Sequence, residues 1–367
     1  MAVGAGEGDA IGNILTLIWY LSFFFFLIYG QKIQTWMMLR EIGGAVNRLK
    51  VFRDDARRMA IKAVKEVGKE EDPTPRIDHF MEYFTTLPAS LDPAGLVPKI
   101  DHVIDVRDQR FRDEVALIAP QADGVVISNL TGVMEVALGL NFIYRIVRHF
   151  YLLGKKTMSL YVIMQIQMQL PIIMQLAEAY FGAVKAFANG QPIGDGAGAL
   201  VAAKLMYGKA KRKIAKDIVA SEVPIDGRRV FVIKAEGPGA NIGKPGDGIQ
   251  RLIEECNGEV SMVVMVDAAS KFEGEKSGET AEGIGTAIGG IGVDQFKIEE
   301  TVTSHMIPVN AVIIKESLKD AVAPMKKEIY EGVEVALARV KRLIHERTKE
   351  GSTVIVAGVG NTVGIGQ

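Results

Sequence analysis

The chain is poor in cysteine and nearly lacks net charge. Its single cysteine, Cys256, excludes a disulfide framework and a zinc site built from cysteines, which fits a reducing compartment. The 43 Lys and Arg residues nearly balance the 44 Asp and Glu residues, so the composition does not indicate a nucleic-acid-binding protein. What remains is a 367-residue chain, long enough for two or more structural units.

Charge is absent from one long stretch, residues 11–30, and this stretch is strongly apolar. It has about the 20 residues that one helix needs to cross the hydrocarbon core of a bilayer. Trp19 and Tyr29 are residue types that favour the headgroup level. The leader carries Glu7 and Asp9 but no basic residue, and no A-x-A cleavage site follows, which disfavours a signal peptide. The sequence therefore predicts an uncleaved transmembrane anchor, with membrane lipids as partner.

Basic residues dominate the segment that follows this anchor. The positive-inside rule places such a flank, and with it the bulk of the chain, in the cytoplasm, with the N-terminus outside. The same charges attract anionic lipid headgroups. The residues concerned are Lys32, Arg40, Arg48, Lys50, Arg53, Arg57 and Arg58.

The middle of the chain reads as helical. Residues 31–128 are expected to form a helical stalk and connector, because apolar residues recur at helical spacing at its start. Residues 129–190 contain two apolar segments, Val133–Leu153 and Met158–Phe187, which we interpret as a helical hairpin. Charged residues inside the first segment are costly at membrane depth. We therefore expect the hairpin to pack on protein or to lie at the interface, with two further crossings as the alternative. The basic residues Arg145, Arg148 and His149 share one helix face, expected to be solvated or to meet lipid headgroups.

Residues 191–367 have the pattern of an α/β domain. Four apolar runs typical of strands, at 229–234, 260–266, 309–314 and 353–357, alternate with helical segments. This alternation predicts an open parallel sheet flanked by helices. Ligands of such sheets bind beyond the carboxyl ends of the strands.

Glycine-rich loops follow these strands and suggest one kind of site. The loop after the first strand precedes a helix, and its backbone N–H groups offer a cradle for phosphate or nucleotide. It matches neither the P-loop nor the dinucleotide-binding pattern, so tight turns and close packing explain its glycines equally well. The candidate phosphate-binding residues are Gly237, Gly239, Gly243 and Gly246.

Acidic residues and a histidine suggest another site. Asp195 precedes a helix, Asp267 ends the most apolar strand, and His305 precedes the third strand. Two carboxylates and a histidine are ligands for zinc or a similar divalent metal that activates water. Lys271 and Glu273 follow Asp267 and are candidates for proton transfer. The alternative is that Asp195 caps a helix, Asp267 hydrogen-bonds its own loop and His305 lies at the surface.

Three short motifs resemble those of the hydrogenase-maturation endopeptidase and spore-protease-like α/β fold. They are G-V-G-N at Gly358–Asn361, GDGAGALVA at 194–202, and VVMVDA ending at Ala268. In that fold the G-x-G-N strand comes first, whereas here it comes last, so the match requires a circular permutation. The resemblance implies that Asp195, Asp267 and His305 are metal ligands. Gly196 stands where that fold has a second acid.

Nearly the full chain resembles an uncharacterised family of archaeal membrane proteins, through the anchor, the RIVRHFYLLGKKT and MQLPIIMQ helices and the PIGDGAG loop. That resemblance implies no activity. The sequence therefore predicts a membrane-anchored protein facing the cytoplasm, with a metal-dependent hydrolase acting on a peptide or small molecule as the most specific function. The alternatives are a homo-oligomeric scaffold joined through residues 133–187, and a phosphate- or nucleotide-binding sensor.

Overall fold

The computed structural model describes residues 6–67, 72–88, 93–290 and 292–367. The chain divides into two compact units. The first, which we call the three-helix unit, runs up to Val51 and includes Phe142–Met174. The second, the α/β unit, comprises Phe52–Asn141 and Gln175–Gln367.

The three-helix unit is built from parts of α1 (Gly6–Val67), α4 (Gly124–Thr157) and α5 (Leu160–Ala188). Glycines allow these helices to approach closely. A Cβ on Gly43 would lie 3.2 Å from the hydroxyl oxygen of Tyr151, and one on Gly154 would lie 2.8 Å from Cγ1 of Ile163. Gly154 directly follows the first apolar segment of the sequence, Val133–Leu153, and lies inside α4, where its missing side chain makes room for the neighbouring helix.

Two helices, α4 and α5, are long and apolar enough to cross a membrane. Residues 12–25 and 29–67 meet the same criteria only together, as one segment bent by 56°. The prediction of a single N-terminal span with the hairpin outside the membrane is therefore not supported, since the candidate spans lie in the middle of the chain. Membrane association itself is compatible with these helices.

Within the α/β unit, two helices precede the sheet: α2 (Thr74–Phe80) and α3 (Pro93–Ile118). Aromatic rings join them, with the ring centroids of Phe80 and Phe111 4.6 Å apart. In the same unit α4 packs on α5, where a Cβ on Gly132 would lie 2.8 Å from the ring of Phe187. The apolar residues of α4 on this side are therefore buried against protein.

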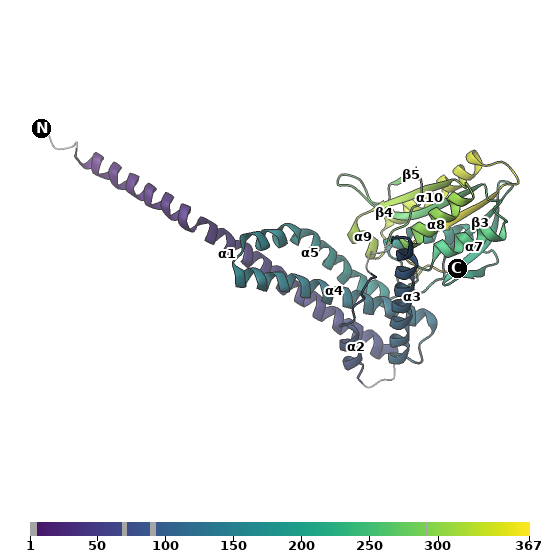
Figure 1. Cartoon of the computed structure of the whole chain (residues 1–367), viewed down its shortest axis with the longest axis horizontal. Coiled ribbons are helices and arrows are strands. Elements are labelled where there is room, and N and C mark those ends of the chain that lie inside the picture. The colour runs from purple at the N-terminus through teal and green to yellow at the C-terminus, as the bar shows by residue number, and fades with distance from the viewer. Residues whose placement is uncertain (1–5, 68–71, 89–92, 291) are drawn as a thin grey trace. The chain divides into compact units, whose positions relative to one another are not determined.

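The sheet has seven strands in the order β1-β2-β3-β7-β4-β6-β5 (Figure 1). Strands β3, β7, β4 and β6 run parallel, β1 and β2 continue the sheet antiparallel beyond β3, and β5 pairs antiparallel with β6. The strands are β1 (Arg212–Ala215), β2 (Ile218–Ile225), β3 (Arg228–Ala235), β4 (Met262–Ser270), β5 (Thr280–Ile284), β6 (Val309–Glu316) and β7 (Thr353–Gly358).

The four predicted strands are confirmed as β3, β4, β6 and β7, and they form the parallel centre of the sheet. The prediction of a wholly parallel sheet is wrong, because three antiparallel strands complete it. These three carry weak sequence signals. β1 is only four residues long, β2 contains Pro224, and β5 contains Gly283 and is largely exposed. Short or glycine-containing strands are typical of sheet edges, where β1 and β5 lie, whereas β2 is an inner strand paired with both β1 and β3.

Helices cover both faces of the sheet. One face packs against α6 (Ala197–Leu205) and α10 (Lys327–Arg347), with Val264 and Val356 fully buried among them. The other face packs against α7 (Pro245–Glu255) and α8 (Val293–Ser304), with Met265 and Ile355 fully buried. The continuous apolar runs of the central strands follow from this double cover. The short helices η1 (Gly194–Gly196) and α9 (Leu318–Val322) lie at the carboxyl ends of the strands.

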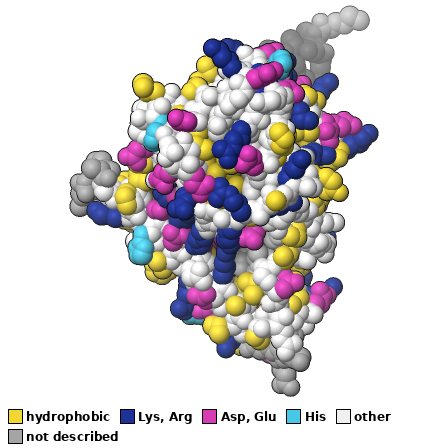
Figure 2. All heavy atoms as spheres, turned by 90° about the vertical axis from the view of Figure 1, so that its right-hand side faces the viewer, with side chains coloured by type: hydrophobic (Ala, Val, Ile, Leu, Met, Phe, Trp, Pro, Cys, Tyr) yellow, Lys and Arg dark blue, Asp and Glu magenta, His cyan; other side chains and the backbone are white. Residues whose placement is uncertain are grey.

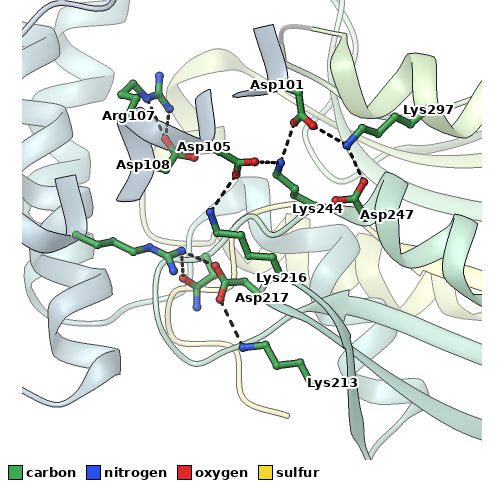
Figure 3. A network of polar contacts seen from close by, with 12 residues as sticks. Asp101, Asp105, Arg107, Asp108, Lys213, Lys216, Asp217, Lys244, Asp247 and Lys297 are labelled. Atoms are coloured by element: carbon green, nitrogen blue, oxygen red, sulfur yellow. Dashed lines mark hydrogen bonds and ion pairs between the residues drawn. The ribbon is translucent and has the colours of Figure 1, made fainter. Parts of the chain in front are cut away.

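A network of ion pairs ties α3 to the sheet domain within the α/β unit (Figure 3). The amine of Lys244 lies 2.8 Å from a carboxylate oxygen of Asp101 and 2.6 Å from one of Asp105. The amine of Lys297 bridges Asp101, at 2.8 Å, and Asp247, at 2.7 Å. Burial alone would lower the pKa of Lys297, but its hydrogen bonds to the two carboxylates raise that pKa to about 12. The amine is therefore charged at neutral pH.

We expect Lys297→Met to lower the free energy of unfolding of the α/β unit by about 1–2 kcal/mol, because it leaves Asp101 and Asp247 half-buried without this partner. Urea denaturation at low salt measures the change. The matched control is Lys327→Met, whose ion pair with Glu331 is well exposed and should be worth less than about 0.5 kcal/mol. Equal losses in both variants would contradict a structural role for the network.

Candidate functional site

The site lies at the carboxyl edge of the parallel strands. Strand β7 ends at Gly358, which pairs with Val266 of β4. Asp267 is thus the first residue of β4 beyond its pairing with β7. On the other side β4 stays paired with β6 as far as Ser270 and Glu316. The early end of β7 opens a notch in the sheet edge beside Asp267.

A glycine-rich turn fills this notch. Gly198, at the start of α6, packs directly on the backbone of β4 and of the segment after β7, and a Cβ there would overlap the carbonyl oxygen of Val266. Gly360 has a positive φ of 119° and faces the carbonyl of Asp195. Only glycine permits backbones to approach so closely. The three motifs 194–198, 266–268 and 358–361, far apart in the sequence, therefore meet at one place.

Asp195 is held from the backbone of the last motif. The backbone N–H of Asn361 donates a hydrogen bond of 2.9 Å to its Oδ2 atom. Burial of the carboxyl raises its pKa, and this hydrogen bond opposes the rise only in part. Asp195 is not a helix cap, because η1 precedes α6 and the side chain reaches Asn361 instead.

Asp267 is buried on the face of β4 toward α7 and α8, and only 7% of it is exposed. Burial, followed by the nearby charge of Asp195, raises its pKa to about 8. Hydrogen bonds from the backbone N–H groups of Ala268, at 2.8 Å, and of Gly289 oppose this rise. Asp267 therefore retains a proton at neutral pH in a large share of molecules.

Glu316, the last residue of β6, pairs with Ser270, three residues beyond Asp267, and by strand alternation lies on the face of the sheet toward α6 and α10. The charges of Asp195 and Asp267 act on it, and we call these three residues at the carboxyl edge the carboxyl cluster: Asp195, Asp267 and Glu316. It is 2% exposed, and neither of its carboxylate oxygens has a hydrogen-bond partner among the described residues. Burial, then the charges of Asp195, Asp320 and Asp267, raise its pKa to about 8. A Cβ on Gly194 would overlap its Oε2 atom, so that glycine leaves room for the carboxyl.

Asp320 lies four residues after Glu316, and its pKa is lowered instead of raised. Burial would raise its pKa, but hydrogen bonds from Lys326, Ser277 and Ser317 lower it to about 2. The amine of Lys326 lies 2.5 Å from Oδ1, and the hydroxyl of Ser277 lies 2.7 Å from Oδ2. Neighbouring carboxyls whose pKa values are pushed apart are typical of acid–base sites. Burial thus raises the pKa of Glu316, whereas hydrogen bonds and the charge of Lys326 lower that of Asp320.

His305 does not join the carboxyl cluster. It follows α8 and precedes β6, which places it at the amino edge of the sheet, opposite Asp267. The Nδ1 atom of its exposed ring lies 2.9 Å from the carbonyl oxygen of Thr301. Among the described residues no group of three or more His, Cys, Asp or Glu side chains is arranged to hold a metal ion. The structure thus brings two of the three predicted metal ligands together and leaves out the third.

The predicted proton-transfer residues directly follow strand β4, and the backbone N–H of Lys271 donates a hydrogen bond of 2.9 Å to the carbonyl oxygen of Glu316. Strand β4 continues to Ser270, so Lys271 and Glu273 follow Asp267 by four and six residues, about 13–20 Å along an extended chain. The amine of Lys271 lies near the carbonyl oxygen of Phe272, and Glu273 is exposed. A role of these two residues in proton transfer stays a prediction.

The predicted phosphate loop is packed against protein at each of its candidate glycines. A Cβ on Gly237 would overlap the carbonyl of Ile365, one on Gly239 would touch Ser128, and one on Gly243 would lie 2.7 Å from the carbonyl of Asp217. The N–H of Gly246 already donates to the carboxylate of Asp294 at 2.9 Å. Close packing accounts for these glycines, and a phosphate or nucleotide site stays a prediction.

Glu316 was missed by the sequence argument although the necessary signal was present. Like Asp267, it ends an apolar strand of the parallel sheet and so lies at the edge where ligands bind. His305, by contrast, precedes that same strand. A residue before a parallel strand cannot meet residues that follow its neighbours.

We expect the protein to lose stability as pH rises from about 5 to 9. The folded-state pKa of Glu316, about 8, lies above the ordinary value of 4.5, so its contribution is complete below 4.5 and lost as pH rises through 8. Glu316→Gln should remove part of this slope and be the more stable protein at pH 9 by about 1–3 kcal/mol. Denaturation curves across this pH range measure the difference.

The control for this experiment is Glu346→Gln, which changes an exposed carboxylate. Its stability should follow the wild-type curve. If the Glu316→Gln curve runs parallel to the wild-type curve instead, Glu316 does not hold a proton in the folded state.

Two family models match this chain in succession. Residues 16–190 match the model described as the N-terminal domain of a protein of unknown function (DUF1512), and residues 193–366 match its C-terminal domain. The boundary falls directly before η1, where the carboxyl cluster begins. No curated protein and no solved structure matches the chain. The chain belongs to the DUF1512 family and carries both of its domains.

Proposed function

We propose that this protein is a membrane-attached hydrolase whose reaction centre is the carboxyl cluster of Asp195, Asp267 and Glu316. The observation that supports this most is Glu316, a fully buried carboxyl whose oxygens have no hydrogen-bond partner among the described residues. Burying such a group without a partner costs free energy. Strongly displaced pKa values in one place are typical of functional sites.

The cluster has the chemistry of general acid–base catalysis. With pKa values of about 8, Asp267 and Glu316 hold protons at neutral pH and can release them over a small pH range. Three carboxyls that repel one another do not all ionise together, so an acid and a carboxylate are present at once. The carboxylate removes a proton from the attacking water, and the acid protonates the leaving group.

The resemblance to the endopeptidase fold suggests a peptide or another amide as substrate class. The three resembling motifs meet at one place, as a shared site would require. Glu316, at the end of β6, lies at the same carboxyl edge of the sheet as the two acids, whereas that resemblance implies a histidine there. A small-molecule amide or ester would use the same chemistry.

A divalent cation at the cluster is the second candidate, favoured by the unpartnered oxygens of Glu316. Three carboxylates are hard oxygen donors and suit Mg²⁺, Mn²⁺ or Ca²⁺ better than zinc. The side chains, as they lie among the described residues, do not converge as a ligand set. No step of the proposed reaction is therefore assigned to a metal.

Attachment to the membrane is proposed to run through α1. Its apolar side chains from Ile14 to Tyr29 are exposed wherever the structure describes them, with Leu15 and Trp19 both at 62%. Such exposure suits lipid better than water. Lys32 and Arg40 follow this segment, which under the positive-inside rule places the α/β unit in the cytoplasm and the N-terminus outside.

Hydrolysis by the full chain tests the proposal. We expect turnover of at least one of three chromogenic substrate classes: a peptidyl anilide, a carboxylic ester and a phosphoester. Asp267→Asn should lower kcat by a factor on the order of 10²–10⁴, because it removes a proton-transfer group. The control Glu346→Gln should leave kcat unchanged.

Chelation separates the two candidates, since a metal-dependent rate falls with a chelator and returns with Mg²⁺ or Mn²⁺, whereas acid–base catalysis by the carboxyls alone is unaffected. If Asp267→Asn and Glu316→Gln both turn over substrate at the wild-type rate, neither acid–base catalysis nor metal-dependent catalysis at the cluster is correct.

A further inference from the structure

The three-helix unit has a charge imbalance that the chain as a whole does not share. The unit carries eight Lys and Arg side chains against three acidic ones, Glu7, Asp9 and Glu41, while the whole chain has a net charge of −1. The rest of the chain is therefore acidic. On the face of the molecule drawn in Figure 2, by contrast, Lys and Arg side chains lie interspersed with Asp and Glu.

Half of these basic residues lie near the end of α4. Arg145, Arg148, His149 and Lys156 line a cavity of about 330 Å³, together with Leu152 and Leu153. Both arginines and Lys156 are exposed. None of these three cations forms an ion pair with a carboxylate among the described residues. Glu41 accepts a hydrogen bond of 2.7 Å from Gln167 instead.

Apolar side chains surround these unpaired cations in the same unit. Phe142 on α4 is 62% exposed, Met158 in the turn 52%, and Tyr161 on α5 75%. A surface that combines exposed apolar and basic side chains fits the boundary between acyl chains and headgroups better than water. The long stems of Arg and Lys allow their charged ends to reach the headgroup level.

The basic end of α4 packs on α1 just after the apolar segment. Gly154 lies against Leu39, ten residues beyond Tyr29, which corresponds to about 15 Å along a helix. Between them, Trp36 is 58% exposed and the guanidinium of Arg40 lies 5.7 Å from the centre of its ring. An exposed tryptophan beside arginine is typical of the membrane interface.

We infer that the cavity lined by Arg145, Arg148, His149 and Lys156 binds the phosphate headgroup of an anionic phospholipid at the bilayer surface. The phosphate oxygens accept hydrogen bonds from the two guanidinium groups and the amine. Leu152 and Leu153 contact the start of the acyl chains. This inference rests on the proposed membrane attachment, and the experiment below separates the failure of one from the failure of the other.

The experiment compares full-length chains incorporated into bilayers of phosphatidylcholine alone and of phosphatidylcholine with phosphatidylglycerol. The ratio of the two lipids retained by the extracted protein is measured by native mass spectrometry. Wild type should retain phosphatidylglycerol preferentially. Arg145→Gln/Arg148→Gln should lower this preference roughly fivefold for each arginine removed, and Arg145→Lys/Arg148→Lys should keep most of it.

The matched control is Lys319→Gln/Lys341→Gln, which removes two exposed charges from the α/β unit and should keep the preference. An unchanged preference in Arg145→Gln/Arg148→Gln, or an equal loss in the control, would overturn the inference. So would competition by soluble inorganic phosphate, because the cavity would then be a site for free anions. If the wild-type protein enters both bilayers but shows no lipid preference, the headgroup site is wrong and the membrane attachment stands. If it enters neither bilayer, the membrane attachment is wrong as well.

Discussion

The carboxyl cluster depends on the close approach of backbones at one edge of the sheet. The turn at Gly194–Gly198 packs into the notch that β7 leaves when it ends at Gly358, and this contact is possible only because Gly198, Gly358 and Gly360 have no side chains. The approach places Asp195 at the same sheet edge as Asp267 and Glu316, where all three carboxyls are buried. Burial then raises the pKa of each group, and the charge of Asp195 adds to the rise at Asp267 and at Glu316. Larger side chains at the glycines would separate the backbones and let water hydrate the carboxylates, so the chemistry follows from the packing.

The sequence predicted the centre of the sheet because β3, β4, β6 and β7 are continuous apolar runs, which only doubly covered strands require. It did not predict β1, which is short and polar, β2, which contains Pro224, or β5, which contains Gly283. The meeting of Asp195 and Asp267 follows from the rule that strand ends share an edge, and the same rule selects Glu316 over His305. The desolvation of Glu316 was beyond sequence reasoning, since it depends on contacts with Gly194 that only the folded chain contains.

The apolar helices show a second limit of sequence reasoning. Length and composition mark α4 and α5 as candidate spans. Yet Val133, Met134 and Leu140 of α4 are fully buried within the described protein, while Leu15 and Trp19 of α1 are more than half exposed. An apolar run has the same composition whether it faces protein or lipid, and only packing distinguishes the two. In our account the protein is attached to the membrane through α1 and the basic end of α4, and the α/β unit supplies the reaction centre.

The most direct test of the central claim is a ¹³C NMR titration of the side-chain carboxyls in the full-length protein, with Asp267→Asn and Glu316→Gln to assign the signals. The account predicts that the cluster titrates with apparent pKa values of about 8, as burial and mutual repulsion require. Asp320, held by Lys326, should stay ionised down to a pH of about 2. Midpoints near the ordinary value of about 4 for both Asp267 and Glu316 would contradict the account, because solvated carboxylates would not hold the protons that the proposed reaction uses.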